Sequence, residues 1–303
     1  MTHSRSIKNV VIIGGGLMGQ GIAEVSAVAG LATTLIKASG QGAESTRTKI
    51  EKSLSKAVER GKLSGEQASA ALKNLVVTGD RGALAEADIV IESIVEDLAI
   101  KKDLFATVLN SIPAHCILAS NTSTLRIRDL APASAADRTI GLHFFSPVPA
   151  MELVELAYLD STDDALKKRA TEFVEAIGKT PIPVLDATGF IVNRLLVPYL
   201  LGAIAAYDQG LAPAPYLDTA MQLGCRHPVG PLMLSDLIGL DIVYSMSKLL
   251  FAAFEDARFE PPTLLARLVE QGTLGKKSGK GFYDHGHRPA VPNEELWQSI
   301  QSG

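Results

Sequence analysis

Residues 10–19 read Val-Val-Ile-Ile-Gly-Gly-Gly-Leu-Met-Gly, a short apolar run that passes directly into a glycine cluster. The segment from Leu17 to Ala29 is typical of a helix, which Gly30 would end. The glycines fit G-x-G-x-x-G, a pattern that is weak alone but gains weight between a strand and a helix. The stretch therefore predicts a strand, a nucleotide-binding loop and a helix.

The residues of this loop have separate expected roles. Gly14 permits the tight turn, Gly16 lets the backbone approach a pyrophosphate, and Gly19 lets the helix pack close to the sheet. Leu17 and Met18 open the helix, whose first N–H groups would hold the negative charge. The alternative is a glycine turn that binds no ligand.

Beyond the loop, apolar β-rich runs alternate with helical segments as far as about Asp186. Expected strands are 33–36, 75–78, 88–95, 116–119, 139–143, 153–157 and 182–185, and expected helices include 41–60, 98–111 and 164–177. Fully apolar strands that alternate with helices indicate a buried parallel sheet. We expect an α/β protein in which residues 1–186 form a Rossmann-like, doubly wound, dinucleotide-binding domain.

After that boundary the strand-like runs disappear. Expected helices are 191–207, 215–223, 232–255 and 263–271, and Gly and Pro residues separate them. We expect residues 187–303 to form an all-helical C-terminal domain for substrate binding or dimerisation. The segment from about His285 is expected to be a polar tail, so that His285 and His287 are not expected to bind a metal.

Composition narrows the classes of function. The 303 residues suit two domains, and 47% hydrophobic with 20% charged residues suits a soluble globular chain. The net charge of -4 argues against general nucleic-acid binding. The longest apolar stretch, 195–207, is shorter than the roughly 20 residues of a membrane span. Two distant cysteines, Cys116 and Cys225, do not indicate a disulfide framework or a metal cluster, so we expect a cytoplasmic protein without a metal.

The end of the second strand bears on the choice of cofactor. In NAD-binding domains an acidic residue about 20 positions after the loop hydrogen-bonds the ribose 2′-hydroxyl. This chain has Lys37 there, followed by Ala38 and Ser39. A cation beside a small hydroxyl suits a 2′-phosphate, because charge-assisted bonds to phosphate are strong. We therefore favour NADP(H), with a solvated Lys37 and bound NAD(H) as the alternative.

Polar residues follow two later strands of the predicted sheet. Residues 120–123 read Ser-Asn-Thr-Ser, and residues 141–149 contain His143. Ligands of open parallel sheets bind outside the carboxyl ends of the strands. Glu155 comes a short distance after the second group, and Asn193 lies just past the expected domain boundary, where it can face the same cleft.

With these motifs in order, the chain resembles the L-3-hydroxyacyl-CoA dehydrogenase family, over residues 7–283. The matching motifs are the glycine loop with 21–23, and residues 120–123, 143–145, 189–194, 227–232 and 275–279. The resemblance implies an NAD(P)-dependent enzyme that interconverts a 3-hydroxyacyl thioester and its 3-ketoacyl partner. It also implies an acyl-CoA substrate and a homodimer formed through the helical domain.

The resemblance implies roles for individual residues. His143 would be the general base, since imidazole exchanges protons near neutral pH, and Glu155 would fix its tautomer. Ser120 and Asn193 would hydrogen-bond the substrate oxygen. Positions that match cofactor contacts are Glu96, Lys101, Ser120, Ser146 and Lys277, and positions that match CoA contacts are Ser53 and Arg60. As alternatives, Ser120 caps the next segment, and Ser53 and Arg60 belong to a solvated helix face.

Two positions depart from the family's pattern. Lys37 replaces the acidic residue after the second strand, and Ser146 stands where an asparagine is familiar. These changes hint at a specialised, biosynthetic enzyme, for which the alternative substrates are a free hydroxy acid or a thioester on an acyl carrier protein. A third alternative is a non-enzymatic nucleotide-binding or structural protein, because fold does not fix function. The presence of the four residues with expected catalytic roles argues against it: Ser120, His143, Glu155 and Asn193.

Overall fold

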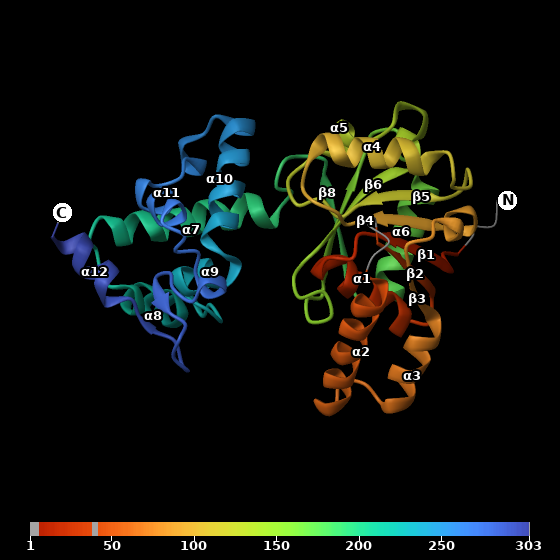
Figure 1. Cartoon of the computed structure of the whole chain (residues 1–303). Helices are drawn as coiled ribbons and strands as arrows, with labels where there is room; N and C mark the ends of the chain where they lie inside the picture. The colour runs from red at the N-terminus through yellow and green to blue at the C-terminus, as the bar shows by residue number, and fades with distance from the viewer. Residues whose placement is uncertain (1–5, 38–41, 303) are drawn as a thin grey trace. The chain divides into compact units, whose positions relative to one another are not determined.

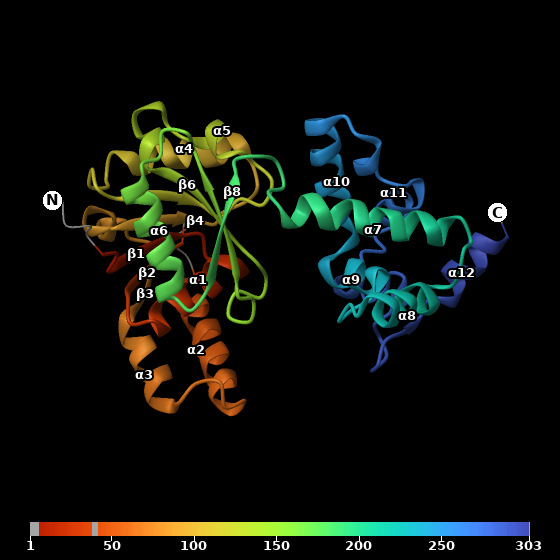
Figure 2. The same cartoon turned by 180° about the vertical axis from the view of Figure 1, so that it is seen from behind.

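The computed structural model describes residues 6–37 and 42–302, so that Ser39 lies outside the described residues. The chain divides into two compact units, Met1–Phe190 and Ile191–Gly303. Figures 1 and 2 show the strands gathered in the first unit and helices making up most of the second. The α/β architecture with a helical C-terminal domain, expected from the sequence, is confirmed.

A sheet of eight strands forms the first unit, in the order β3-β2-β1-β4-β5-β6-β7-β8. The strands are β1 Asn9–Ile13, β2 Ala32–Ile36, β3 Leu75–Thr78, β4 Ile89–Glu92, β5 Ile117–Ser120, β6 Thr139–Phe144, β7 Leu153–Tyr158 and β8 Thr180–Leu185. Strands β1 to β6 are mutually parallel. The direction of winding reverses between β1 and β4, and such a switch point is where open sheets bind ligands.

Two apolar layers cover this sheet. Val10 and Ile12 of β1 pack into one layer, and Val11 and Ile13 pack into the other, because successive strand residues face opposite sides. Helices α4 and α5 cover one face, and α1 and α6 cover the opposite face (Figures 1 and 2). The helices are α1 Leu17–Val28, α2 Ala43–Glu59, α3 Gly65–Asn74, α4 Leu98–Leu109, α5 Ile127–Leu130 and α6 Asp164–Ala176.

The expectation of an all-parallel sheet is wrong at one edge. Strand β7 runs antiparallel to β6, and β8 then runs parallel to β7. Only residues 145–152 join β6 to β7, and they contain no helix. A parallel pair needs a crossover of a dozen or more residues, so this short connection can form only an antiparallel pair.

The second unit is helical among its described residues, apart from one small hairpin. Its helices are α7 Val192–Asp208, α8 Ala214–Cys225, α9 Pro231–Ile238, α10 Leu240–Phe254, α11 Thr263–Glu270 and α12 Glu294–Gln301. The single helix expected over 232–255 is wrong, because Gly239 interrupts it at a φ of 107°. Within the described ranges no single helix could cross a membrane; only α9 and α10 together reach the required length and composition, across a bend of 95°.

The expected polar tail is also wrong. Strands β9 Tyr283–Asp284 and β10 Val291–Pro292 pair as an antiparallel hairpin, and α12 follows. The ring of Trp297 in α12 lies 5.1 Å from that of Tyr207 in α7. This segment therefore packs against the core of the second unit.

Candidate functional site

The glycine loop has the geometry that a dinucleotide requires. Gly14 has a φ of 126°, and a Cβ there would collide with the carbonyl of Ser93. A Cβ at Gly19 would collide with the carbonyl oxygen of Gly14, so the helix can approach the strand only with glycine at this position. A Cβ at Gly16 would meet no atom within 4 Å, so this point of the backbone faces open space.

The first turn of α1 faces the same opening. Gly16 is the N-cap residue and provides no side-chain cap, and the side chain of Leu17 is 71% exposed. The first N–H groups of a helix without a side-chain cap form an anion site, strengthened by the helix dipole. Met18 packs against the core behind this turn. The loop residues therefore fit a pyrophosphate.

Lys37 follows β2 and lies over the loop. A Cβ at Gly15 would come within 2.8 Å of its Cγ, and one at Gly42 would come within 3.0 Å of its Nζ. The side chain thus runs from the glycine loop toward Gly42 at the start of α2, where its ammonium group lies. This is the side of the loop where the adenosine ribose of a dinucleotide binds.

His143 and Glu155 form a buried pair across β6 and β7. The two residues are directly opposite in the antiparallel register, and His143 Nδ1 lies 2.7 Å from Glu155 Oε2. The rings of Phe145 and Phe190 lie 4.4 Å and 5.6 Å from the imidazole. The carboxylate accepts from Nδ1–H, which fixes one tautomer and leaves Nε2 to exchange a proton with a substrate.

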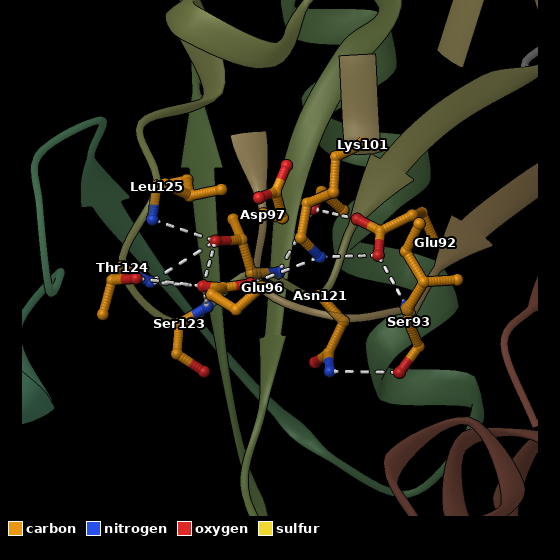
Figure 3. Close-up of polar contacts among 12 residues, drawn as sticks. Glu92, Ser93, Glu96, Asp97, Lys101, Asn121, Ser123, Thr124 and Leu125 are labelled. Carbon is orange, nitrogen blue, oxygen red and sulfur yellow. Dashed lines mark hydrogen bonds and ion pairs between the residues drawn. The ribbon is translucent and has the colours of Figure 1, made fainter. Parts of the chain in front are cut away.

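A second cluster, buried except for Glu96, lies at the carboxyl ends of β4 and β5 (Figure 3). Lys101, from α4, lies between two carboxylates, with its Nζ 2.6 Å from Glu92 Oε1 and 3.2 Å from Glu96 Oε2. Ser120 donates its hydroxyl to Glu92 Oε2 at 2.6 Å and is fully buried. The structure thus brings Glu96, Lys101 and Ser120 together and gives the Ser120 proton a protein acceptor.

Glu96 holds the loop that follows β5. Its Oε1 accepts hydrogen bonds from Thr122 Oγ1 at 2.6 Å, Ser123 N at 2.8 Å, and Thr124 N and Oγ1 at 3.0 Å. Burial disfavours the charged carboxylate, but Lys101 and these donors outweigh burial and hold the pKa of Glu96 below its ordinary value. Glu96 is therefore a charged anchor for residues 122–124.

The other candidates in the first unit for contacts with CoA or the cofactor lie on separate elements, namely helix α2 and the loop between β6 and β7. Ser53 lies on α2 and hydrogen-bonds the buried Glu24, and burial, its largest influence, raises the pKa of Glu24. Arg60 is the exposed C-cap residue of the same helix. Ser146 is exposed on the loop between β6 and β7.

Two candidates belong to the second unit. Asn193 lies in the first turn of α7 and is buried. Lys277 lies on the turn before β9, and its ammonium group forms an ion pair with Asp241 of α10.

The sequence analysis gave no role to two polar residues of the site, although Asn121 lies within the motif at residues 120–123. Glu92 accepts from Lys101 and Ser120, and Asn121 Oδ1 accepts from Phe144 N at 2.9 Å. A carboxylate inside the apolar run 88–95 was the available signal, because a buried charge needs a partner. That signal identifies neither partner.

Among residues 6–37 and 42–302, no group of three or more His, Cys, Asp or Glu side chains could hold a metal ion.

Comparison with known proteins gives a consistent result over both units. Residues 9–187 match the family of the 3-hydroxyacyl-CoA dehydrogenase NAD-binding domain, and residues 189–285 match that of the 3-hydroxyacyl-CoA dehydrogenase C-terminal domain.

Full-length relatives are similar in sequence and structure. The chain is 43% identical over 285 residues to the 3-hydroxybutyryl-CoA dehydrogenase of Mycobacterium tuberculosis, covering 93% of this chain and 100% of that one. It is 39% identical to the mitochondrial hydroxyacyl-coenzyme A dehydrogenase of Rattus norvegicus, covering 92% and 91%. The crystal structure of (S)-3-hydroxybutyryl-CoA dehydrogenase from Ralstonia eutropha superposes with a TM-score of 0.88 at 37% identity, covering 92% and 99%.

Proposed function

Because the chain belongs to the 3-hydroxyacyl-CoA dehydrogenase family, we propose a catalytic mechanism centred on His143 and its partner Glu155. The protein is an oxidoreductase that interconverts 3-hydroxyacyl-CoA and 3-ketoacyl-CoA. The observation that carries the proposal is the contact of 2.7 Å between His143 Nδ1 and Glu155 Oε2.

In this mechanism His143 moves the substrate proton. During oxidation Nε2 takes the proton from the 3-hydroxyl, and during reduction it returns that proton to the new alkoxide oxygen. A nicotinamide cofactor held by the glycine loop would supply the hydride chemistry. Glu155 stabilises the imidazolium and keeps the ring oriented. Asn193 donates to the substrate oxygen. Ser120 was expected to do the same, but its hydroxyl proton is directed to Glu92, so in this mechanism it orders the neighbouring strand end.

We assign the cofactor to the glycine loop and its neighbours. Gly14, Gly16 and Gly19 shape the loop, and the N–H groups of Leu17 and Met18 at the start of α1 hold the pyrophosphate. Glu96, Lys101, Ser146 and Lys277 are the proposed contacts on the nicotinamide side, and Ser53 and Arg60 those of the CoA portion.

We assign NADP(H) as the preferred cofactor. Lys37 directly follows β2, and its side chain lies over the glycine loop, where a carboxylate would repel a 2′-phosphate and a cation would bind it. A preference for NADP(H) also favours reduction of the 3-ketoacyl thioester. A thioester carried on an acyl carrier protein is the alternative substrate, and a free hydroxy acid is a further one.

The test is reduction of acetoacetyl-CoA by the purified protein, with NADH and NADPH in parallel. Faster turnover with NADPH supports the role of Lys37, and faster turnover with NADH contradicts it. No turnover with either cofactor, by folded protein that binds nucleotide, contradicts a CoA substrate and favours the carrier-protein alternative.

We further propose a homodimer formed through the second unit. Tyr216 and Leu223 stand seven residues apart on α8, with side chains 71% and 79% exposed, and Leu195 on α7 is 69% exposed. Large apolar side chains at such spacing on one helix are typical of an interface. Analytical ultracentrifugation should give twice the chain mass, and Leu223→Asp should lower it to the monomer; a monomeric wild type contradicts the proposal.

We also propose a cytoplasmic location. Cys116 and Cys225 are both free thiols in the described structure, and free thiols persist in a reducing compartment. Fractionation of cells that express the protein checks this, and recovery outside the cytoplasm contradicts it.

A further inference from the structure

Glu92 lies at the switch point of the sheet, directly behind the glycine loop. It ends β4, the strand beside β1, and the next residue, Ser93, is the one whose carbonyl packs against Gly14. In the parallel register Glu92 is opposite Ser120 of β5. Its side chain is fully buried, so what it does there depends entirely on its protein partners.

Both oxygens of Glu92 are occupied by donors. Oε1 accepts from Lys101 Nζ at 2.6 Å and from Ile94 N at 2.7 Å, and Oε2 accepts from the Ser120 hydroxyl at 2.6 Å. Figure 3 shows Lys101 reaching Glu92 from α4. Each of these three contacts places a protein donor on a carboxyl oxygen of Glu92.

The hydrogen-bond chain continues from Ser120 toward His143. Ser120 Oγ accepts from Thr122 N at 3.2 Å, which fixes the turn that contains Asn121. Asn121 Oδ1 accepts from Phe144 N at 2.9 Å, and Phe144 is the residue after His143. Asn121 Nδ2 also donates to Ser93 Oγ at 3.5 Å, a contact that Figure 3 shows. The ends of β4, β5 and β6 are thereby joined.

A stabilising role alone does not account for this arrangement. A buried ion pair contributes little net stability, because desolvation of its charges offsets their attraction. The Glu92 carboxylate does, however, orient the Ser120 hydroxyl group. Because the Ser120 proton points to Glu92 Oε2, the lone pairs of Ser120 Oγ have a fixed direction as well. Small displacements of a proton-transferring group cost large factors in rate.

We propose that Glu92 is a positioning residue for hydride transfer, which acts through Ser120 and Asn121 to hold the strand end that carries His143. This inference rests on the proposed function. Glu92 touches neither substrate nor cofactor in this role. It sets the hydroxyl direction of Ser120, and Lys101 supplies the charge that makes its burial tolerable.

The substitution Glu92→Gln selectively changes the hydrogen bond between Glu92 and Ser120. The amide oxygen stays toward Lys101 Nζ and Ile94 N, which are both donors, so the amide nitrogen must face Ser120 Oγ. Ser120 then accepts instead of donating, and its proton turns elsewhere. Lys101 keeps its second carboxylate, Glu96. The matched control is Glu86→Gln, the same substitution at an exposed position.

The variants are compared in reduction of acetoacetyl-CoA, with cofactor affinity and melting temperature measured on the same samples. We expect Glu92→Gln to lower kcat about tenfold or more and to leave the cofactor Kd within about twofold. With cofactor deuterated at the transferred position, the isotope effect on kcat should rise, because hydride transfer becomes slower. On a Ser120→Ala background, Glu92→Gln should change kcat by no more than about twofold.

Two results would overturn the inference: a folded Glu92→Gln protein with wild-type kcat, or an equal loss on the wild-type and Ser120→Ala backgrounds. If Glu92→Gln does not fold, the kcat and isotope effect of Ser120→Ala are used to test the inference. A lower kcat with a larger isotope effect then supports the inference, and unchanged kcat overturns it. Failure of the proposed function is distinct, because the wild type itself would then show no turnover.

Discussion

His143 and Glu155 face each other across an antiparallel strand pair, with 2.7 Å between Nδ1 and Oε2. This relationship depends on the reversed direction of β7. If β7 ran parallel to β6, a different residue would lie opposite His143. The short connection over residues 145–152 therefore does more than join two strands, since it brings a carboxylate to the imidazole. Both side chains are buried, which strengthens their interaction.

Glu155→Gln should lower kcat about 100-fold while the protein stays folded. The amide can no longer balance an imidazolium and can donate toward Nδ1, which favours the wrong tautomer. Steady-state reduction of acetoacetyl-CoA measures the effect. Glu175→Gln, an exposed substitution on α6, is the control. If Glu155→Gln keeps wild-type kcat, the carboxylate has no part in proton transfer.

Lys37→Ala should raise the KM for NADPH about tenfold or more, because a charge-assisted bond to the 2′-phosphate is lost. The KM for NADH should change less than about twofold, since NADH has no such phosphate. Lys73→Ala, at an exposed position on α3, controls for the loss of one positive charge. Equal effects on both cofactors would show that Lys37 does not read the 2′-phosphate.

Glu96 should make stability depend on pH. Its folded pKa lies below the ordinary 4.5, so its contribution is present above about that pH and is lost as pH falls through the folded pKa. Glu96→Gln should therefore lower the free energy of unfolding by about 1–2 kcal/mol at pH 7, and less in acid. Urea unfolding across pH, with Glu86→Gln as control, measures this difference. A difference that grows toward acid would contradict the assignment.

Asp236 should anchor the C-terminal hairpin. Its buried carboxylate accepts from Phe282 N at 3.0 Å, Tyr283 N at 2.9 Å and His285 Nε2 at 3.0 Å. Asp236→Ala leaves two buried N–H groups without this acceptor and should cost about 2–4 kcal/mol.

Urea unfolding measures that loss, and limited trypsin digestion should cut faster after Lys280, which directly precedes the hairpin segment. The exposed substitution Asp160→Ala should change neither quantity. Unchanged stability and protease resistance in Asp236→Ala would show that the hairpin is held by its apolar contacts alone.

Local patterns predicted the parts of the fold that depend on local physics. The glycine loop combines a strand, a turn with positive φ at Gly14 and a helix start, and all three leave residue-type signals. The helix break at Gly239 and the hairpin after Tyr283 left weaker signals. Asp236 binds that hairpin through Phe282, which lies 46 residues further along the chain. A local sequence pattern is too short to include both Asp236 and the hairpin.

In the candidate site, too, residues in local motifs were predicted, whereas contacts between distant segments were not. Motif resemblance implied that Glu155 pairs with His143, but the antiparallel strand direction that brings the two residues opposite each other was not predicted. Glu92 was missed because a carboxylate in an apolar run does not indicate which residues it contacts, here Lys101 and Ser120. Helix α3 was missed too, although Ser64 and Gln67 form a capping box at its start.

The most direct test of the mechanism is the reduction of acetoacetyl-CoA by His143→Ala beside the wild type, at saturating cofactor. We predict that kcat falls by a factor of about 10³, within the range that general acid–base catalysis contributes, and that cofactor affinity is unchanged. A His143→Ala protein with kcat within tenfold of the wild type would contradict the assignment of His143 as the proton-transferring residue.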